Sequence, residues 1–427
     1  MIALVLAGAL QAALPQDSLP QVTLEEALRR GTNLDPGYVA ALGQVRDAKW
    51  QRTAAIAAFI VPAVTVQTTA QWYSSDIFNI GTGQLSSKIF SAQAVATLDV
   101  FRGGQHVFDL QRRRAEFASA TASEVEARFR TALFIESDFY DVLAQQELLR
   151  VAEERVRRAG EQLAVARARV LTGAAVQTDS LQLLLELTRA RVDLLRARAL
   201  LTVARIQLGR RMGVTGPMGA VPLDPTPPPS LPITEDQAVA EALEQSPTAL
   251  VVRADQRAAE AGLRSAWGLY LPVVTLSGLV TAYDAKFFPS ATSRAGLGLT
   301  VSLPIWNNAQ REIALSHART TLDVARAVRS DAELGVQRDV VEAYEAYTTA
   351  RAAFDLAREA VTVAQENLRV QDERYRAGAT TILDLVTAQV SFTEAEAGLV
   401  QARYASRLAF AGVEALLGRR FGTEERQ

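Results

Sequence analysis

The sequence predicts a mainly α-helical protein with a smaller β section, and two observations lead to this prediction. Two long stretches, 105–172 and 309–377, contain no proline, and their apolar residues recur at alternating steps of four and three, the period of a coiled coil. At about 1.5 Å per residue, each stretch would form a helix of roughly 100 Å. The second observation is that the whole pattern of elements is written twice.

The internal repeat appears when three pairs of segments, 205 to 210 positions apart, are aligned in the same order. Chance similarity does not produce three such matches, so the chain is an internal duplication. The pairs are FIVPAVTV (59–66) with LYLPVVTL (269–276), TLDVFRGGQ (97–105) with SLPIWNNAQ (302–310), and RVLTGAAVQTDS (169–180) with RYRAGATTILDL (374–385).

Residues 216–234 separate the two halves and hold seven of the fifteen prolines. Such a run excludes a helix and favours extended backbone, so we expect it to connect the repeats. The apolar opening, MIALVLAGALQAALPQ, has the composition of a secretory signal core, although no positive charge precedes it. The expected divisions are a signal peptide, whole or truncated at its start, at 1–16, a first repeat at 17–215, the connector at 216–233, a second repeat at 234–420 and a C-terminal tail at 421–427.

Each repeat is expected to contain a short helix, a second helix, two strands, the long helix and a return helix. The strands are predicted from apolar residues that alternate with period two. In the first half they cover 63–73 and 91–100, with an outer loop at 74–90, and in the second half the outer loop is 284–294. The expected short helices are 23–32 and 234–245, and the second helices are 36–60 and 247–269, ended by Pro62 and Pro272.

Four strands of about 10 residues have the length that crosses a bilayer when tilted, although the strands of a soluble sandwich alternate in the same way. The apolar face predicted for 91–100 ends at Val100. Four strands cannot close a barrel around a lumen. Closure would therefore need other copies of the chain.

The long helix 309–377 carries two adjoining apolar stripes, and the return helices show the same signal. Two stripes favour a helix packed between two neighbours, as in the wall of a tube, while a solid antiparallel bundle predicts similar stripes and stays open as an alternative. The first stripe is Val336, Val340, Ala343, Tyr347, Ala350, Phe354, Ala357, Val361, Ala364 and Leu368, the second is Ala346, Ala350, Ala353, Ala357, Ala360 and Ala364, and the return-helix stripe is Leu181, Leu185, Thr188, Val192, Leu195, Ala199, Thr202 and Ile206.

The composition leaves little for enzymatic chemistry. The chain has no cysteine, and its two histidines, His106 and His317, lie far apart in the sequence. Disulfides, thiolate metal sites and a cysteine nucleophile are therefore excluded, and no GxSxG, GxGxxG or P-loop pattern occurs. We expect no enzymatic activity, no cofactor and no bound metal. The net charge of −2 also provides no basic excess for nucleic acid.

The two helix–Pro–strand segments, the strand-to-helix turns DVFRGGQ and LPIWNNAQ, and the two helix reversals together resemble the outer-membrane efflux protein family, the TolC-like outer-membrane factors. The resemblance covers the chain after the signal segment. It implies a homotrimer in which four strands per protomer close a 12-stranded transmembrane β-barrel, continued by a long periplasmic α-helical barrel. The implied location is the outer membrane of a Gram-negative-type bacterium, with the helices extending into the periplasm.

The function implied by the resemblance is passive export, as the outer-membrane channel of a tripartite efflux or type I secretion system. The implied partners are a periplasmic adaptor (membrane fusion protein) and an inner-membrane transporter of the RND or ABC type. The alternative is a soluble periplasmic coiled-coil adaptor or scaffold protein, which also carries long helical hairpins.

The two reversals have an expected structural role. Gly173 and Gly378 are expected to end the long helices in the left-handed conformation. Thr178 or Asp179 is expected to cap the first return helix, and Asp384 is expected to lie in the first turn of the second. These roles explain both motifs without any function.

The resemblance adds two functional roles for the reversals. It implies a periplasmic entrance gate in which threefold symmetry forms one acidic ring per reversal, weaker than that of the best-known family member because Thr387 and Thr380 replace an aspartate and an arginine. Small, uncharged tips suit docking of adaptor hairpins, and tight turns also prefer small residues. The implied gate residues are Asp179, Asp384, Thr178, Tyr375 and Thr387, and the implied docking residues are Gly173, Ala174, Ala175, Val176, Gly378, Ala379, Thr380 and Thr381.

Overall fold

The computed structural model describes residues 19–79, 82–224, 226, 230–289 and 292–421. The predicted signal peptide lies outside these residues, as does the predicted C-terminal tail after its first residue. The chain forms two compact units. Unit one comprises Met1–Val39, Glu126–Glu241 and Arg338–Gln427, and unit two comprises Ala40–Val125 and Ala242–Gln337.

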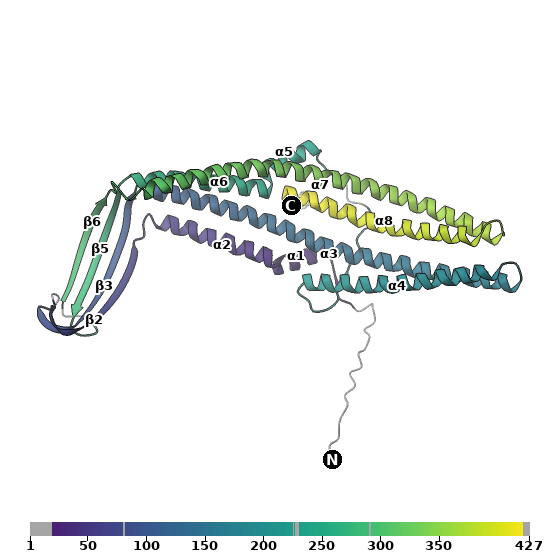
Figure 1. Ribbon diagram of the computed structural model, residues 1–427, viewed down its shortest axis with the longest axis horizontal. Helices are drawn as coiled ribbons and strands as arrows, with labels where there is room; N and C mark the ends of the chain where they lie inside the picture. The colour runs from purple at the N-terminus through teal and green to yellow at the C-terminus, as the bar shows by residue number, and fades with distance from the viewer. Residues whose placement is uncertain (1–18, 80–81, 225, 227–229, 290–291, 422–427) are drawn as a thin grey trace, which may run out of the picture. The chain divides into compact units, whose positions relative to one another are not determined.

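The helices and longer strands follow the same order in both halves of the chain (Figure 1). The predicted helices are confirmed to within a few residues at their ends. The first half contains α1 (Leu24–Leu34), α2 (Pro36–Ala57), β2 (Ala63–Asn79), β3 (Gln84–Arg102), α3 (Gln105–Leu171) and α4 (Gln177–Arg211). The second half contains α5 (Glu235–Gln245), α6 (Pro247–Trp267), β5 (Val273–Asp284), β6 (Thr292–Ser302), α7 (Gln310–Arg376) and α8 (Ile382–Leu417).

Local signals set several helix ends. Helix α1 begins where the Thr23 hydroxyl accepts a hydrogen bond from a backbone N–H of the first turn, and α6 begins in the same way at Ser246, with Pro247 at its first position. Helix α8 ends at Gly418, whose φ of 70° lets it adopt the left-handed cap. Among the described residues, a search for a helix both long and apolar enough to traverse a membrane finds none.

Unit two contains an antiparallel sheet with the strand order β2-β3-β5-β6 (Figure 1). The central pairing joins the two halves of the chain, because β3 of the first half lies beside β5 of the second. The two hairpins therefore merge into one surface, and the register of all four strands is fixed through β3 and β5.

The prediction of an outer loop at 74–90 is wrong. Strands β2 and β3 are 17 and 19 residues long, so most of that segment is strand. The register of β2 on β3 shifts between Trp72 and Ile77, and this irregularity breaks the alternation on which the prediction rested. Strands β5 and β6, with 12 and 11 residues, have the expected length. Of the loop predicted at 284–294, the described residues 285–289 lie outside any strand, whereas Asp284 and residues 292–294 belong to the two strands.

A second, two-stranded sheet in unit one was not predicted. Strand β1 (Gln21–Val22) pairs in parallel with β4 (Gly219–Ala220), which lies within the proline-rich connector. The Gly219 N–H donates to the Pro20 carbonyl at 2.9 Å. Two-residue strands carry no readable alternation, so only the folded structure reveals that the start of the connector is fastened to the N-terminal segment.

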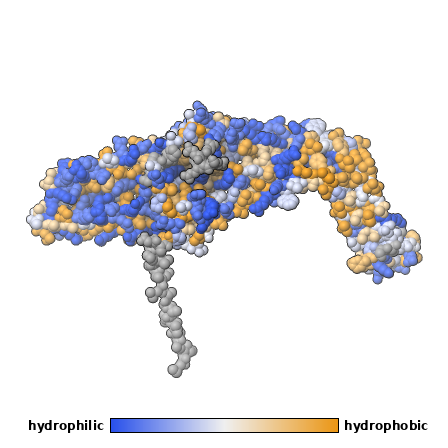
Figure 2. Space-filling model, turned by 180° about the vertical axis from the view of Figure 1, so that it is seen from behind, coloured by the Kyte–Doolittle hydropathy of each residue, from blue (hydrophilic) through white to orange (hydrophobic). Residues whose placement is uncertain are grey.

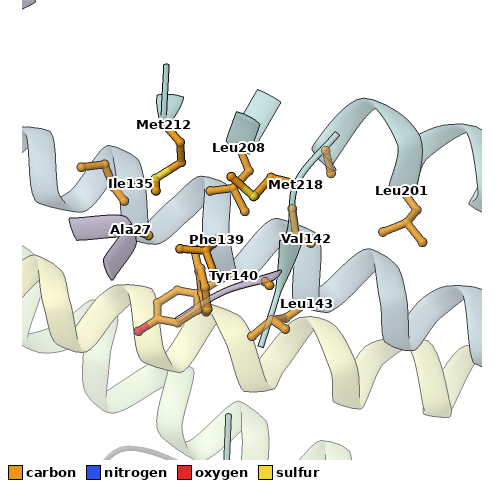
Figure 3. Close-up of a cluster of buried hydrophobic side chains, with 13 residues drawn as sticks. Ala27, Ile135, Phe139, Tyr140, Val142, Leu143, Leu201, Leu208, Met212 and Met218 are labelled. Carbon is orange, nitrogen blue, oxygen red and sulfur yellow. The ribbon is translucent and has the colours of Figure 1, made fainter. Parts of the chain in front are cut away.

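The largest apolar cluster of unit one lies where α3 meets α1, α4 and the small sheet (Figure 3). Phe139 and Ile135 of α3 are fully buried, and they face Leu208 of α4 and Met212. Helix α1 lies close to α3 at Gly31, which has no side chain: a Cβ on Gly31 would lie 2.8 Å from the Ile135 side chain. Close packing of this kind fixes the position of α1 against the long helix.

Candidate functional site

The first helix reversal joins α3 to α4. Gly173 has a φ of +74°, and the Ala174 N–H donates to the Arg169 carbonyl at 2.8 Å, which caps the end of α3. The prediction that Thr178 or Asp179 caps α4 is wrong. The capping position is Val176, whose side chain makes no capping hydrogen bond, and α4 begins before Thr178, so both polar residues lie inside its first turn.

The second reversal joins α7 to α8 and is capped more completely. Gly378 has a φ of +75°, as expected. Thr381 and Asp384 form a reciprocal capping box, which confirms Asp384 in the first turn. The Asp384 carboxylate accepts hydrogen bonds from the hydroxyl groups of Thr381, at 2.7 Å, and Thr380, at 2.8 Å. These hydrogen bonds hold the pKa of Asp384 below its usual value, so this exposed carboxylate is ionised at neutral pH.

Arg169 connects the two reversals. Its Nη1 donates to the backbone carbonyl of Tyr375 at 2.6 Å, and its guanidinium lies 4.9 Å from the centre of the Tyr375 ring. Its Nη2 also reaches the Ala174 carbonyl at 3.4 Å. One side chain therefore bonds to both tips. The site prediction missed Arg169, although the arginine four residues before each tip glycine was a signal that could have found it.

Tyr375 and Asp179 are brought together at the same place. The Tyr375 side chain is buried, and its hydroxyl has no hydrogen-bond partner among the described residues. Burial raises the pKa of the Tyr375 phenol, and the nearby Asp179 carboxylate raises it further. The tyrosine is therefore neutral at physiological pH, with Arg169 on its ring and Asp179 near its hydroxyl.

The remaining gate candidates lie at the surface of one copy of the chain. Thr178 and Thr387 are exposed, and Asp384 is exposed beside its threonines. Most of the predicted docking residues are also exposed, and a Cβ on Gly173 would meet nothing within 4 Å. Space above this tip is open, so Gly173 is required by its backbone conformation and not by a close neighbour.

A groove of about 560 Å³ lies next to these reversals, between α3, α7 and α8. Its lining is largely charged, and Arg158 lies across it, 3.0 Å from Glu396 and 4.9 Å from the ring centre of Phe392. Arg369 and Asp372 of α7 line the other side. The groove leads from the Tyr375 side chain along the helices, and its paired charges leave a mixed polar and aromatic surface.

The sheet of unit two has one apolar face. The register places Val66, Ala94, Val280 and Ala295 side by side across all four strands. This face is open to solvent in one copy of the chain: Val66 is 72% exposed and Leu297 is 79% exposed. Figure 2 shows apolar residues gathered over the strands. The other members of this face include Val64, Ala70, Trp72, Phe90, Ala92, Ala96, Leu98, Val274, Leu276, Ala282, Leu299 and Val301.

The opposite face of the sheet is mainly polar, although Val95 and Leu279 also lie on it. Gln67, Gln93, Thr281 and Arg294 form one row across the four strands. The register shifts between Asp99 and Phe101, so Val100 is left without a partner at the irregularity and Phe101 pairs with Val274 of the apolar face. A mainly apolar face opposite a mainly polar one is typical of strands that lie between lipid and water.

No group of three or more His, Cys, Asp or Glu side chains that could hold a metal ion occurs among the described residues. The arrangement therefore consists of backbone caps, ion pairs and exposed apolar surfaces.

Long helical hairpins joined to an antiparallel four-stranded sheet define the TolC-like channel fold. The solved structure of CusC matches with a TM-score of 0.78 at 15% identity and covers 96% of each chain. The outer membrane protein VceC from Vibrio cholerae matches with a TM-score of 0.76 at 16% identity, over 93% of this chain and 96% of that one.

Sequence comparison identifies the family. The model of the outer membrane efflux protein family matches residues 32–214 and again residues 238–419, so the chain belongs to this family. The outer membrane efflux protein BepC of Brucella suis is 26% identical over 271 residues. That match covers 62% of this chain and 58% of the Brucella protein.

Proposed function

We propose that this chain forms the outer-membrane channel of a tripartite efflux or type I secretion system, as a homotrimer. The observation that carries the proposal is the open sheet with one exposed apolar face. Exposed apolar area of this extent is unfavourable in water, and monomeric soluble proteins rarely show it. A lipid environment removes that cost, in agreement with the outer-membrane location of the family.

The strand edges support association of several copies. Strands β2 and β6 form the two edges of the sheet, and each pairs with one neighbour only within the described chain. Backbone N–H and C=O groups at a lipid-exposed edge must be paired, so the sheet has to close. Three copies would supply twelve strands, with the apolar face toward lipid and the polar face toward the lumen.

The helices also carry apolar stripes that no other part of the described chain covers. Leu183, Leu187 and Leu208 of α4 are buried within the chain, whereas the predicted return-helix stripe is open, with Leu195 65% and Ile206 49% exposed. Ala346, Ala353 and Ala360 of the second α7 stripe are exposed as well. A solid bundle would bury both stripes inside one copy. A second apolar stripe that is exposed in one copy favours a helix that packs between two neighbours in the wall of a tube.

The first test is the state of the purified, mature protein. We expect a trimer that requires detergent for solubility and dissociates to monomers only on heating, because both the sheet edges and the apolar face need partners. Size-exclusion chromatography with light scattering and electrophoresis of unheated samples measure this. A monomer that is stable in water without detergent would favour the alternative, a soluble coiled-coil scaffold.

The acidic residues at the reversals are proposed as an entrance gate. In a trimer, Asp384 and Asp179 would each occur three times around the axis. Rings of carboxylates attract cations and can be blocked by multivalent ions. Asp384 suits this role because it is exposed and its pKa is lowered, while Asp179 is half-buried and lies near the Tyr375 hydroxyl, whose pKa it raises.

Asp384→Asn should weaken the block of channel conductance by divalent cations. Asparagine keeps an acceptor for the Thr381 N–H and removes the charge, so the helix cap is retained. The pKa of Asp384 is depressed, so its charge is present above the usual aspartate value near 3.9 and is lost only as pH falls below it. In planar bilayers, the block of the unsubstituted trimer should therefore persist to about pH 4 and disappear in more acidic solution.

Glu366→Gln is the matched control for this experiment, because Glu366 is an exposed acid of α7 that bonds to Arg369 and lies outside the proposed gate. The control should leave the block unchanged. The gate assignment of Asp384 would be refuted by an Asp384→Asn channel that keeps both the wild-type closed-state conductance and the wild-type block.

The helix tips are proposed to dock a periplasmic adaptor, which in turn connects the channel to an inner-membrane transporter of the RND or ABC type. Gly173, Ala174, Gly378 and Ala379 leave the tips narrow and exposed. The groove between α3, α7 and α8 continues from the tips and offers charged and aromatic groups to a second helical hairpin.

Ala174→Trp and Ala379→Trp should abolish export while leaving detergent-extracted trimers intact. Both alanines are exposed and have no left-handed backbone, so a large side chain obstructs the tip without straining the turn. Export is measured in cells that contain the native adaptor and pump, and complex formation by cross-linking to the adaptor. Asp323→Trp, at an exposed position early in α7, serves as the control and should export normally.

A further inference from the structure

A chain of aromatic side chains lies at the hairpin end of the sheet, opposite to the end where the helices join. The Trp72 and Phe90 ring centres are 5.8 Å apart, and Phe90 lies 5.7 Å from Phe287. Phe287 is 5.2 Å from Phe288, and all three contacts are edge-to-face. Phe90 is buried beneath the group, while Trp72, Phe287 and Phe288 are 65%, 61% and 82% exposed.

Two lysines accompany these rings. The whole chain contains three lysines, against a large excess of arginine, and Lys88 and Lys286 both lie here. Lys88 is directly opposite Trp72 in the β2–β3 register, and side chains opposite each other in a sheet stand on the same face. Lys286 immediately precedes Phe287. Both lysines are exposed, and neither forms an ion pair among the described residues.

The position of Lys88 on the apolar face is unusual. Charged side chains are costly on a lipid-facing surface except near the membrane boundary, where a lysine extends its ammonium toward the headgroups. The other charged residue on this face, Asp284, is buried and accepts hydrogen bonds from the backbone N–H groups of Ala285 and Lys286. Asp76 is exposed but lies in the irregular stretch of β2 that is out of register with Lys88.

We propose that Trp72, Phe287, Phe288, Lys88 and Lys286 form a binding surface for the phosphate-bearing headgroups of membrane lipids. The aromatic rings lie at the boundary of the hydrocarbon layer, and the two ammonium groups pair with lipid phosphates just outside it. This inference rests on the proposed membrane insertion of the sheet and adds the chemical class of lipid that the hairpin end selects. The occupant is a membrane lipid and not a free anion, because the lysines flank an exposed aromatic surface that a free anion does not need.

The experiment measures lipid retention by the detergent-purified trimer. Native mass spectrometry is performed with added diphosphoryl lipid A, its dephosphorylated form, phosphatidylglycerol or phosphatidylcholine. We expect the phosphate-bearing anionic lipids to bind more tightly than phosphatidylcholine and dephosphorylated lipid A. Each substitution, Lys88→Gln or Lys286→Gln, should weaken binding roughly 5-fold, and the double variant roughly 20-fold or more, from the usual contribution of a lysine near an anionic surface.

Lys49→Gln in α2 is the matched control, and it should leave lipid retention unchanged, as should Asp76→Asn. Equal binding of charged and neutral lipids, or an equal loss in the Lys49→Gln control, would overturn the proposal. Displacement of the lipid by millimolar inorganic phosphate would assign the lysines to a free-anion site instead. A protein that is soluble without detergent would overturn the membrane channel as well, whereas a detergent-requiring trimer with unaltered lipid binding in the double variant would overturn the lipid surface alone.

Discussion

Gly103→Ala is expected to prevent the chain from reaching its folded, assembled state. A Cβ at Gly103 would lie 2.1 Å from the carbonyl oxygen of Gly268, which is a backbone atom and cannot rotate away. Gly103 also has a φ of +57°, which disfavours any side chain. The contact holds the end of β3 against the end of α6 within unit two, so we expect a loss of more than about 4 kcal/mol.

Alanine substitutions at two nearby glycines distinguish the effect of the steric clash from the effect of the backbone conformation. Gly268 has a φ of −60°, but its Cβ would lie 2.6 Å from the Gly103 carbonyl oxygen, so Gly268→Ala tests the steric clash alone. Gly104 has a φ of +76° and an ordinary contact of 3.5 Å to Phe108, so Gly104→Ala tests the backbone conformation and should cost only about 1–2 kcal/mol.

The measurement is the yield of heat-modifiable trimers extracted from membranes, together with their thermal unfolding. Gly43→Ala, in α2, is the control because its Cβ would meet nothing within 4 Å, and it should stabilise the helix by about 0.5–1 kcal/mol. A normal yield of folded Gly103→Ala and Gly268→Ala would show that β3 and α6 are not in close contact.

Arg420→Met is expected to destabilise unit one by about 2–4 kcal/mol, because it leaves a buried carboxylate without its cation. The Arg420 guanidinium lies 2.6 Å from Glu136, whose side chain is only 2% exposed, and 3.7 Å from Glu414, which is 8% exposed. Arg420 itself is 36% exposed, so water reaches part of the site and the loss is below that of a fully buried pair.

The effect of Arg420→Met should depend on pH. Burial raises the pKa of Glu414 above its usual 4.5, so its ionisation destabilises the folded chain as pH rises through the raised value. Without Arg420 this cost is less well offset. The deficit should therefore be largest at neutral pH and should shrink as the solution is acidified and Glu414 becomes protonated. Thermal unfolding of detergent-solubilised trimers at several pH values measures it.

Glu136→Gln combined with Arg420→Met should recover part of the loss, since the buried charge is then removed together with its partner. Arg369→Met is the control, because Arg369 bonds to Glu366 and Glu373 at the exposed edge of the groove on α7, where these ion pairs should change stability little. If Arg420→Met were as mild as this control, Arg420 would not stabilise unit one by neutralising Glu136 and Glu414.

The errors of the sequence analysis have physical causes. Segment 74–90 was predicted as a loop between the two strands, yet the β2–β3 hairpin continues past the register shift at Trp72 through backbone pairing. The α4 cap was assigned to Thr178 or Asp179 because these types cap helices well, whereas the tight turn after Gly173 starts α4 earlier, at Gln177. In both cases the backbone geometry prevailed over the preference of single side chains.

The sequence by itself determined the features that depend on local physics. Helical period, proline positions and capping residues depend on residues that are close together in the sequence. For this reason the repeat, the helix lengths, the glycine turns and the place of Asp384 could be predicted. The tertiary structure alone decided which of two apolar stripes on α4 is buried, that Arg169 reaches from the first reversal to Tyr375 in the second, and that Arg420 neutralises Glu136. Those outcomes depend on contacts between residues distant in the sequence, whose free energy exists only when the chain has packed.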